Sequence, residues 1–190
     1  LIWSYILLLT TGVVHATVLN ARFEGVEVLD QADITQMLVQ ILTVEGIDTL
    51  DGADAVAAIA ARLPRYGVTA FCPTSVACPP GELAVFLAQV RAARVARPGA
   101  RVLPAHLESN FINPEYAGAQ PSSCLRTPRG ESEGGEFSAR QVLDVVSGSR
   151  PDVGIVTLAP ELPGAIDLLR ALTDAGHRVS LGHSSADFET

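Results

Sequence analysis

The sequence predicts an α/β fold with a parallel sheet. From residue 34 onward, short apolar runs rich in β-branched side chains alternate with longer runs in which apolar residues recur at helical spacing. Strands that alternate with crossover helices assemble into parallel sheets. No Gly-rich dinucleotide-binding fingerprint follows any of the predicted strands. We therefore expect about five βα units and no Rossmann-type cofactor site.

The first two units are predicted before residue 100. Strands are expected at 37–41 and 67–72, and the helices that follow them at 51–63 and 79–97. Prolines near the start of the second helix suit its first turn. Apolar residues at i, i+3, i+4 and i+7 support both helices: Val56, Ile59, Ala60 and Leu63 in the first, Leu83, Phe86, Leu87 and Val90 in the second.

The remaining units are interrupted by a long loop at 109–136, rich in Pro, Gly, Ser and Glu. A loop of this length inside a compact domain usually carries function. Ser138 and Gln141 have the spacing of a capping box and predict a helix start there. The other expected elements are strands at 101–107, 152–158 and 178–181, a helix at 163–175, and a helix start near Ala186.

The number of units points to part of a closed barrel. A (β/α)8 TIM barrel needs about 250 residues, whereas this chain has 190 and supplies about five of the eight units. Five units alone would leave one parallel strand edge uncovered. Residues 34–190 are therefore predicted to be the N-terminal part of such a barrel. Residues 1–33 are left unassigned, with a remnant of a small β domain as one alternative.

The first 14 residues are strongly apolar, and the first arginine is Arg22. A secretory signal would need a basic segment before the apolar run, and a membrane span needs about 20 apolar residues. We expect a buried strand pair or a misplaced start here, and no membrane association.

Composition excludes several classes of function. The net charge of −8 disfavours a nucleic-acid surface. All 13 basic residues are arginine, so no lysine is present for a P-loop, a Schiff base or a carbamylated metal bridge. Cys72, Cys78 and Cys124 form no C-x-x-C motif and are expected to be free thiols in a reducing, cytoplasmic setting.

Three polar residues close predicted strands and could meet at one rim. Gln40, Glu108 and His183 each follow a strand, and barrel enzymes place their chemistry at the carboxyl ends of strands. A carboxylate and an imidazole suit a zinc- or iron-like ion. Taken singly, Glu108 is more often a solvated loop acid and His183 a loop or capping histidine.

Two blocks of sequence carry a family resemblance. The first block is the stretch 106–121 (HLESNFINPEYAGAQP), and the second is VTLAPE at 156–161 followed by GHSSAD at 182–187. Both resemble N-acetylglucosamine-6-phosphate deacetylases of the amidohydrolase superfamily, in the same order. The resemblance covers residues 40–190 and is good from 101 onward. It implies the barrel of the metal-dependent amidohydrolases, and hydrolysis of an N-acetyl group.

The resemblance also implies roles for individual residues. Glu108 and His183 would be metal ligands, and Ala119 and Gln120 would contact the sugar, with Gln120 replacing a commoner histidine. A second histidine ligand and the general-base aspartate would lie beyond Thr190. Ser109-Asn110 replaces the family's usual Gly-Pro.

The first-strand motif departs further from the family. Gln40 matches the glutamine of one family version and is a candidate water or substrate contact, but Leu42 stands where that version has asparagine. One divalent metal ion, zinc or iron, is therefore expected rather than two. His106 is expected to be structural or to support the site, and His15 and His177 to be surface or structural residues.

Neighbouring polar residues are given no catalytic role. Glu161 is interpreted as an acid at a helix start. Ser184 and Ser185 lack the His and Asp partners of a serine hydrolase.

The predicted function is the metal-dependent removal of acetate from N-acetylglucosamine 6-phosphate, giving glucosamine 6-phosphate. The expected partner is a small phosphorylated amino sugar, with no nucleic acid, and the complete protein is expected to be a homo-oligomer. Two alternatives remain open: a related amidohydrolase acting on another N-acyl amino sugar or a cyclic amide, and a catalytically inactive barrel fragment that serves as a subunit or interaction module.

Overall fold

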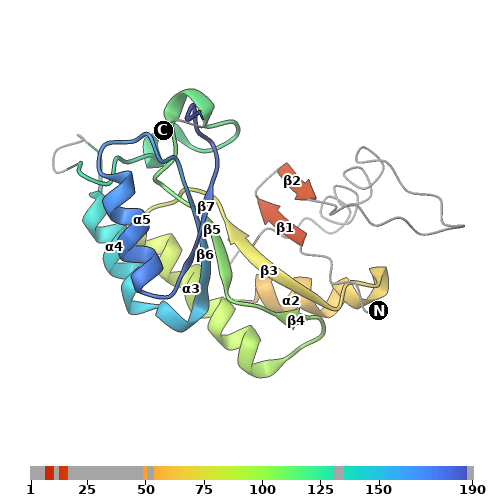
Figure 1. Ribbon diagram of the computed structural model, residues 1–190. Helices are drawn as coiled ribbons and strands as arrows, with labels where there is room; N and C mark the ends of the chain where they lie inside the picture. The colour runs from red at the N-terminus through yellow and green to blue at the C-terminus, as the bar shows by residue number, and fades with distance from the viewer. Residues whose placement is uncertain (1–6, 11–12, 17–48, 51–53, 131–134, 188–190) are drawn as a thin grey trace, which may run out of the picture.

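The computed structural model describes residues 7–10, 13–16, 49–50, 54–130 and 135–187 (Figure 1). Its centre is a sheet with strand order β2-β1-β3-β5-β6-β7, and the short β4 also pairs with β3. The paired strands among β1, β3, β4, β5, β6 and β7 all run parallel, whereas β2 runs antiparallel to its neighbour β1. The strands are β1 Leu7–Thr10, β2 Val13–Ala16, β3 Ala70–Ser75, β4 Arg101–Val102, β5 Ala105–Glu108, β6 Val153–Leu158 and β7 Arg178–Leu181.

Helices connect the parallel strands, as the alternating pattern predicts, and α4 and α5 lie on the same side of the sheet (Figure 1). The capping box at the start of α4 is confirmed: the Ser138 hydroxyl accepts from the Gln141 amide, and the Gln141 side chain accepts from the Ser138 amide. The α-helices are α2 Ala55–Arg62, α3 Pro80–Ala96, α4 Ala139–Gly148 and α5 Ala165–Asp174; the 3₁₀ turns are Leu63–Tyr66, Pro114–Tyr116, Ser122–Cys124 and Arg150–Asp152.

The hydrophobic core lies between the sheet and these helices. Phe71 on β3, Phe86 on α3 and Leu158 on β6 are completely buried. The apolar positions used to predict α2 and α3 also belong to this core. Burial of a large apolar side chain stabilises a fold by about 1.5–3 kcal/mol. These contacts therefore stabilise the packing of the helices on the sheet, and with it the positions of the strand ends.

The single strand expected at 101–107 is interrupted. Ala70 on β3 pairs with Arg101, but Thr74 on β3 pairs with His106, so one extra residue is inserted between the two pairings. Pro104 stands in the gap and has no N–H to offer the ladder. The prediction of one continuous strand was therefore wrong, and the strand segment that ends in Glu108 begins only at Ala105.

The long loop after β5 is held in place by Arg126. Its guanidinium is buried and donates to the carbonyls of Ser123, Leu125 and Phe137. The same group lies 4.0 Å from the centre of the Phe137 ring, an arrangement that favours a cation–π contact. These contacts tie the segment around Arg126 to Phe137, which lies just before α4.

Several other expectations can be compared with the structure. β3 ends at Ser75, three residues later than expected, and no helix begins at Ala186 within the residues described up to Asp187. Of the two alternatives for the first 14 residues, a strand pair is present as β1 and β2, while its burial lies outside what the structure describes. The strand expected at 37–41, including Gln40, lies outside the described residues. Within the described part of the chain, no helix is both long and apolar enough to cross a bilayer.

Candidate metal centre at the strand ends

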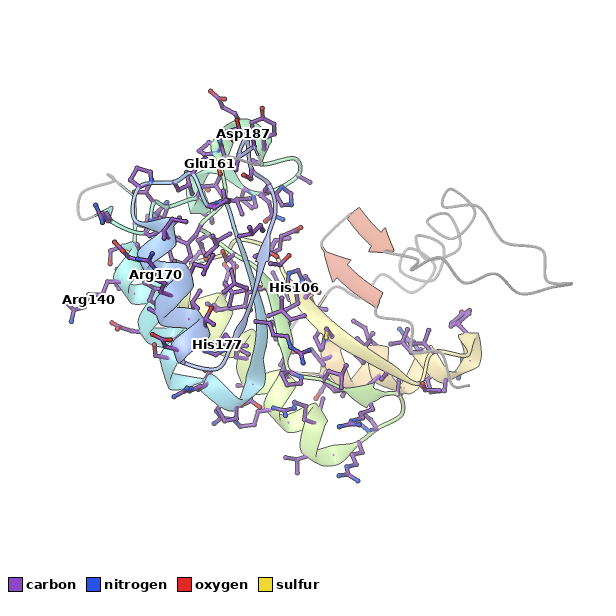
Figure 2. All side chains as sticks on the ribbon, in the orientation of Figure 1. His106, Arg140, Glu161, Arg170, His177 and Asp187 are labelled. Atoms are coloured by element: carbon purple, nitrogen blue, oxygen red, sulfur yellow. The ribbon has the colours of Figure 1, made fainter. Side chains whose placement is uncertain are left out.

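The candidate site lies where β5, β6 and β7 end side by side. Glu108, the last residue of β5, pairs with Thr157 on β6, and Leu158, the last residue of β6, pairs with Leu181 on β7. The loops that leave these strands therefore start at one edge of the sheet. Figure 2 shows Glu161 and Asp187, from two of these loops, at the same end of the molecule.

Glu108 and His183 meet at this edge. Nε2 of His183 lies 2.8 Å from Oε1 of Glu108, and both side chains are largely buried. The sequence prediction that a strand-end acid and a strand-end imidazole converge is confirmed by this geometry.

The second ring nitrogen of His183 has its own partner. Nδ1 lies 2.8 Å from the carbonyl oxygen of Tyr116, which can only accept a hydrogen bond. Burial by itself lowers the pKa of His183, but the hydrogen bonds to Tyr116 and Glu108 and the charge of Glu108 outweigh it, so the pKa is raised. Both nitrogens thus face acceptors, and the neutral ring can donate to only one of them.

The backbone presents His183 in an unusual conformation. Its φ of 52° lies in the left-handed region that few residues other than glycine adopt. The amide of Asn113 donates to the carbonyl of His183, 3.0 Å away. A residue in this region persists when its surroundings fix it, so the position of the imidazole depends on contacts made by neighbouring loops.

Gln120 holds the other oxygen of Glu108. Its side-chain amide donates to Oε2 of Glu108, and its carbonyl oxygen accepts from the amide of Ala77 at 2.8 Å. Gln120 is buried, whereas its neighbour Ala119 is exposed. Both polar groups of Gln120 are therefore engaged with the protein, and a sugar contact stays a prediction for Ala119 and Gln120.

His106 lies on the sheet beneath the site and bridges three strands. Nε2 is 2.7 Å from the hydroxyl of Thr157, and Nδ1 is 3.3 Å from that of Thr74. Burial lowers the pKa of His106 to about 4, so the ring is neutral near pH 7. These contacts fit the structural role predicted from the sequence. His177 is also structural, since it is buried and its Nδ1 lies 2.9 Å from the carbonyl of Val153.

Glu161 is the residue that sequence reasoning undervalued. It lies in the loop after β6, ahead of α5, which starts at Ala165, so the interpretation as a helix-start acid was wrong. Its carboxylate accepts from Asn113, Ser184 and Ser185. The available signal was its position just past a predicted strand end, the same criterion that selected Glu108.

The donor set fits a divalent cation. Two ligand atoms that each lie about 2 Å from one ion can be no more than about 4 Å apart, and the Glu108–His183 distance meets this limit. With an ion bound, the Tyr116 carbonyl would hold the Nδ1 proton and Nε2 would be the ligand atom, as in metal-binding histidines that donate their other ring N–H to a carbonyl. Among the described residues no group of three or more His, Cys, Asp or Glu gathers for metal binding, so this pair supplies only part of a ligand set.

The three cysteines take no part in this site. Cys72, Cys78 and Cys124 are buried free thiols, as expected. Burial raises the pKa of Cys72, and burial together with nearby acidic groups raises that of Cys78 to about 12.

Helices packed on a parallel sheet, with ligand-type side chains at the carboxyl ends of its strands, are the arrangement found in barrel enzymes. Two solved structures share the fold. One is N-acetylglucosamine-6-phosphate deacetylase of Thermotoga maritima, with a TM-score of 0.60 and 28% identity; the match covers 75% of this chain and 35% of the Thermotoga chain. The other is the Mycobacterium smegmatis deacetylase, solved as a mutant in complex with N-acetyl-D-glucosamine-6-phosphate, with a TM-score of 0.61 and 23% identity. This match covers 76% of this chain and 35% of the Mycobacterium chain.

Curated relatives carry the same family name. The N-acetylglucosamine-6-phosphate deacetylase of Rattus norvegicus is 43% identical over 141 residues, which are 73% of this chain and 32% of the relative. That of Vibrio furnissii is 33% identical, over 76% of this chain and 35% of the relative. N-acetylgalactosamine-6-phosphate deacetylase of Escherichia coli O157:H7 is 32% identical, over 76% and 36%. No protein-family model matches.

The chain belongs to the N-acetylglucosamine-6-phosphate deacetylase family of the amidohydrolase superfamily. It spans about a third of the length of the curated relatives it matches.

Proposed function

We propose that this chain contributes the metal-binding rim of an enzyme that hydrolyses the acetamide of N-acetylglucosamine 6-phosphate. The observation that carries the proposal is the contact between Glu108 and His183, in which an imidazole nitrogen and a carboxylate oxygen converge with no other described side chain between them. The names of the relatives supply the substrate class.

The residues of this chain would prepare the site in three ways. Glu108 and His183 would hold the ion, zinc or iron, through Oε1 and Nε2. Gln120 binds the second oxygen of the carboxylate, and the Tyr116 carbonyl would keep the proton on Nδ1 so that Nε2 would be the ligand atom. A divalent ion bound there would supply Lewis-acid chemistry and lower the pKa of a bound water.

A second substrate deserves a direct comparison. One relative of similar identity acts, by its name, on N-acetylgalactosamine 6-phosphate. The two sugars differ in the configuration of one hydroxyl, and a fold does not discriminate such substrates.

Metal removal and restoration test the proposal. Acetate release by the full-length enzyme from N-acetylglucosamine 6-phosphate, its galactosamine epimer and unphosphorylated N-acetylglucosamine is measured before chelation, after chelation, and after Zn²⁺ or Fe²⁺ is restored. We expect release from a phosphorylated sugar that is lost on chelation and recovered with metal. Release that is indifferent to chelation would reject the metal mechanism, and a preference for the galactosamine substrate would reassign the sugar.

A further inference from the structure

We infer that Glu161 is a positioning residue, which holds the loop bearing His183 so that the imidazole faces Glu108. The inference rests on the proposed metal site and adds a residue outside its ligand set. It is carried by the contacts of one carboxylate with two other loops at the rim.

Glu161 accepts hydrogen bonds from the two residues that directly follow His183 in the chain. Its Oε2 accepts from the hydroxyl of Ser184 at 2.6 Å, and its Oε1 accepts from the amide and the hydroxyl of Ser185 at 2.7 and 3.2 Å. Ser184 and Ser185 are the two residues that directly follow His183. The carboxylate therefore fixes the chain immediately after the ligand.

Asn113 links the same carboxylate to the loop after β5. Its side-chain amide donates to Oε1 of Glu161 at 2.9 Å and to the hydroxyl of Ser185 at 3.2 Å, while its backbone amide donates to the carbonyl of His183. Loops from three adjacent strands thus meet at Glu161. Hydrogen bonds hold both the backbone carbonyl of His183 and the two residues that follow it.

The conformation of His183 makes this support necessary. A histidine at φ 52° occupies an unfavourable region of the backbone map and is kept there by surrounding contacts. Without the carboxylate, Ser184 and Ser185 lose their shared acceptor, and the backbone can relax to an ordinary conformation. That relaxation would turn the imidazole away from Glu108.

The chemistry of Glu161 separates this role from metal ligation. Both of its oxygens are occupied by neutral donors from the protein. Among the described residues, no hydrogen bond or ion pair joins the Glu161 carboxylate to Glu108 or to the His183 ring, so Glu161 acts through the serines.

The test compares Glu161→Gln and Glu161→Ala with wild type and with Glu82→Gln, which removes an exposed glutamate charge at the start of α3. Zn²⁺ affinity is measured by calorimetry, the urea midpoint reports global stability, and exchange of the Ser185 amide in the metal-free chain reports the loop. Glu161→Gln keeps the size of the side chain and one acceptor oxygen, so it preserves folding if the alanine variant does not.

We expect Glu161→Ala to weaken Zn²⁺ binding about 10–100-fold, as outer partners of metal ligands commonly do. Glu161→Gln should fall between wild type and alanine in both Zn²⁺ affinity and urea midpoint, and Glu82→Gln should match wild type in Zn²⁺ affinity and in Ser185 exchange. Faster Ser185 exchange should accompany the loss of affinity.

Two results would overturn the inference. One is Zn²⁺ affinity within twofold of wild type in both Glu161 variants. The other is an exchange rate of the Ser185 amide that is the same in both Glu161 variants as in wild type. That result would reject the positioning role of Glu161 even if wild type binds no Zn²⁺. Absence of Zn²⁺ binding by wild type together with faster Ser185 exchange in the variants would instead reject the proposed metal site and leave the loop contact of Glu161 standing.

Discussion

Nε2 of His183 lies 2.8 Å from Oε1 of Glu108, although 75 positions separate the two residues in the chain. The contact spans β6, which lies between the strands that carry them. Neither local spacing nor either strand alone could produce it. The pairing of three parallel strands with their carboxyl ends at one level brings the two side chains together.

A divalent ion is expected to stabilise the wild-type chain and not a Glu108→Gln variant, because the amide cannot supply an anionic ligand. At a concentration 100 times the dissociation constant, a bound ion adds about 2.7 kcal/mol to the free energy of unfolding. For a chain of this size that raises the melting temperature by roughly 5–10 °C.

Thermal unfolding with and without Zn²⁺ measures this effect. Glu115→Gln is the matched control, since Glu115 is an exposed acid in the loop that follows Glu108. An equal Zn²⁺-induced shift in wild type and Glu108→Gln would show that the ion binds elsewhere.

Gln120→Ala should destabilise the fold and weaken metal binding together. The substitution removes the acceptor of the Ala77 amide and the donor to Glu108. A buried polar group left without its partner costs about 1–3 kcal/mol. Urea unfolding and Zn²⁺ titration measure the two effects, with Ala119→Ser as an exposed neighbouring control; a variant unchanged in both would contradict the contacts that we assign to Gln120.

Much of the fold was predictable because it follows from periodicity. The apolar spacing in α2 and α3 and the capping box of α4 are local signals, and each appears in the structure as predicted. The interruption between β4 and β5 was missed because the prediction followed the apolar run alone, although Pro104 within it has no N–H to give a ladder.

The site was predictable only as far as strand ends reveal it. Glu108 and His183 each follow a strand, so their convergence followed from the topology of a parallel sheet. The roles of Gln120 and Glu161 depend on how long loops fold back over that edge. Loop contacts of this kind arise from tertiary packing, and no spacing in the sequence encodes them.

Glu161 should have a pKa of about 2, well below its ordinary 4.5. Burial acts in the opposite direction, but hydrogen bonds from Ser184, Asn113 and Ser185 favour the charged form and outweigh it. Since the folded-state pKa is depressed, this carboxylate contributes stability above about pH 4.5 that is lost as the pH falls toward 2.

Carbon-detected NMR titration of the Glu161 carboxyl measures the pKa directly. Ser184→Ala removes one donor to the charged form and should move the pKa upward, toward its ordinary value. A wild-type pKa near 4.5, or no change in the variant, would contradict the hydrogen bonding described for this carboxylate.

Thr157→Val should destabilise the chain by about 1–3 kcal/mol through His106. Valine has nearly the shape of threonine, so the change removes the hydroxyl 2.7 Å from Nε2 of His106 and leaves the packing in place. Because both residues are buried, no solvent can replace the lost partner. Thr173→Val is the control: Thr173 is exposed on α5, where substitutions usually change stability by no more than about 0.5 kcal/mol. Urea unfolding distinguishes the two variants, and similar small losses in both would mean that the bridge from His106 across the sheet contributes little to stability.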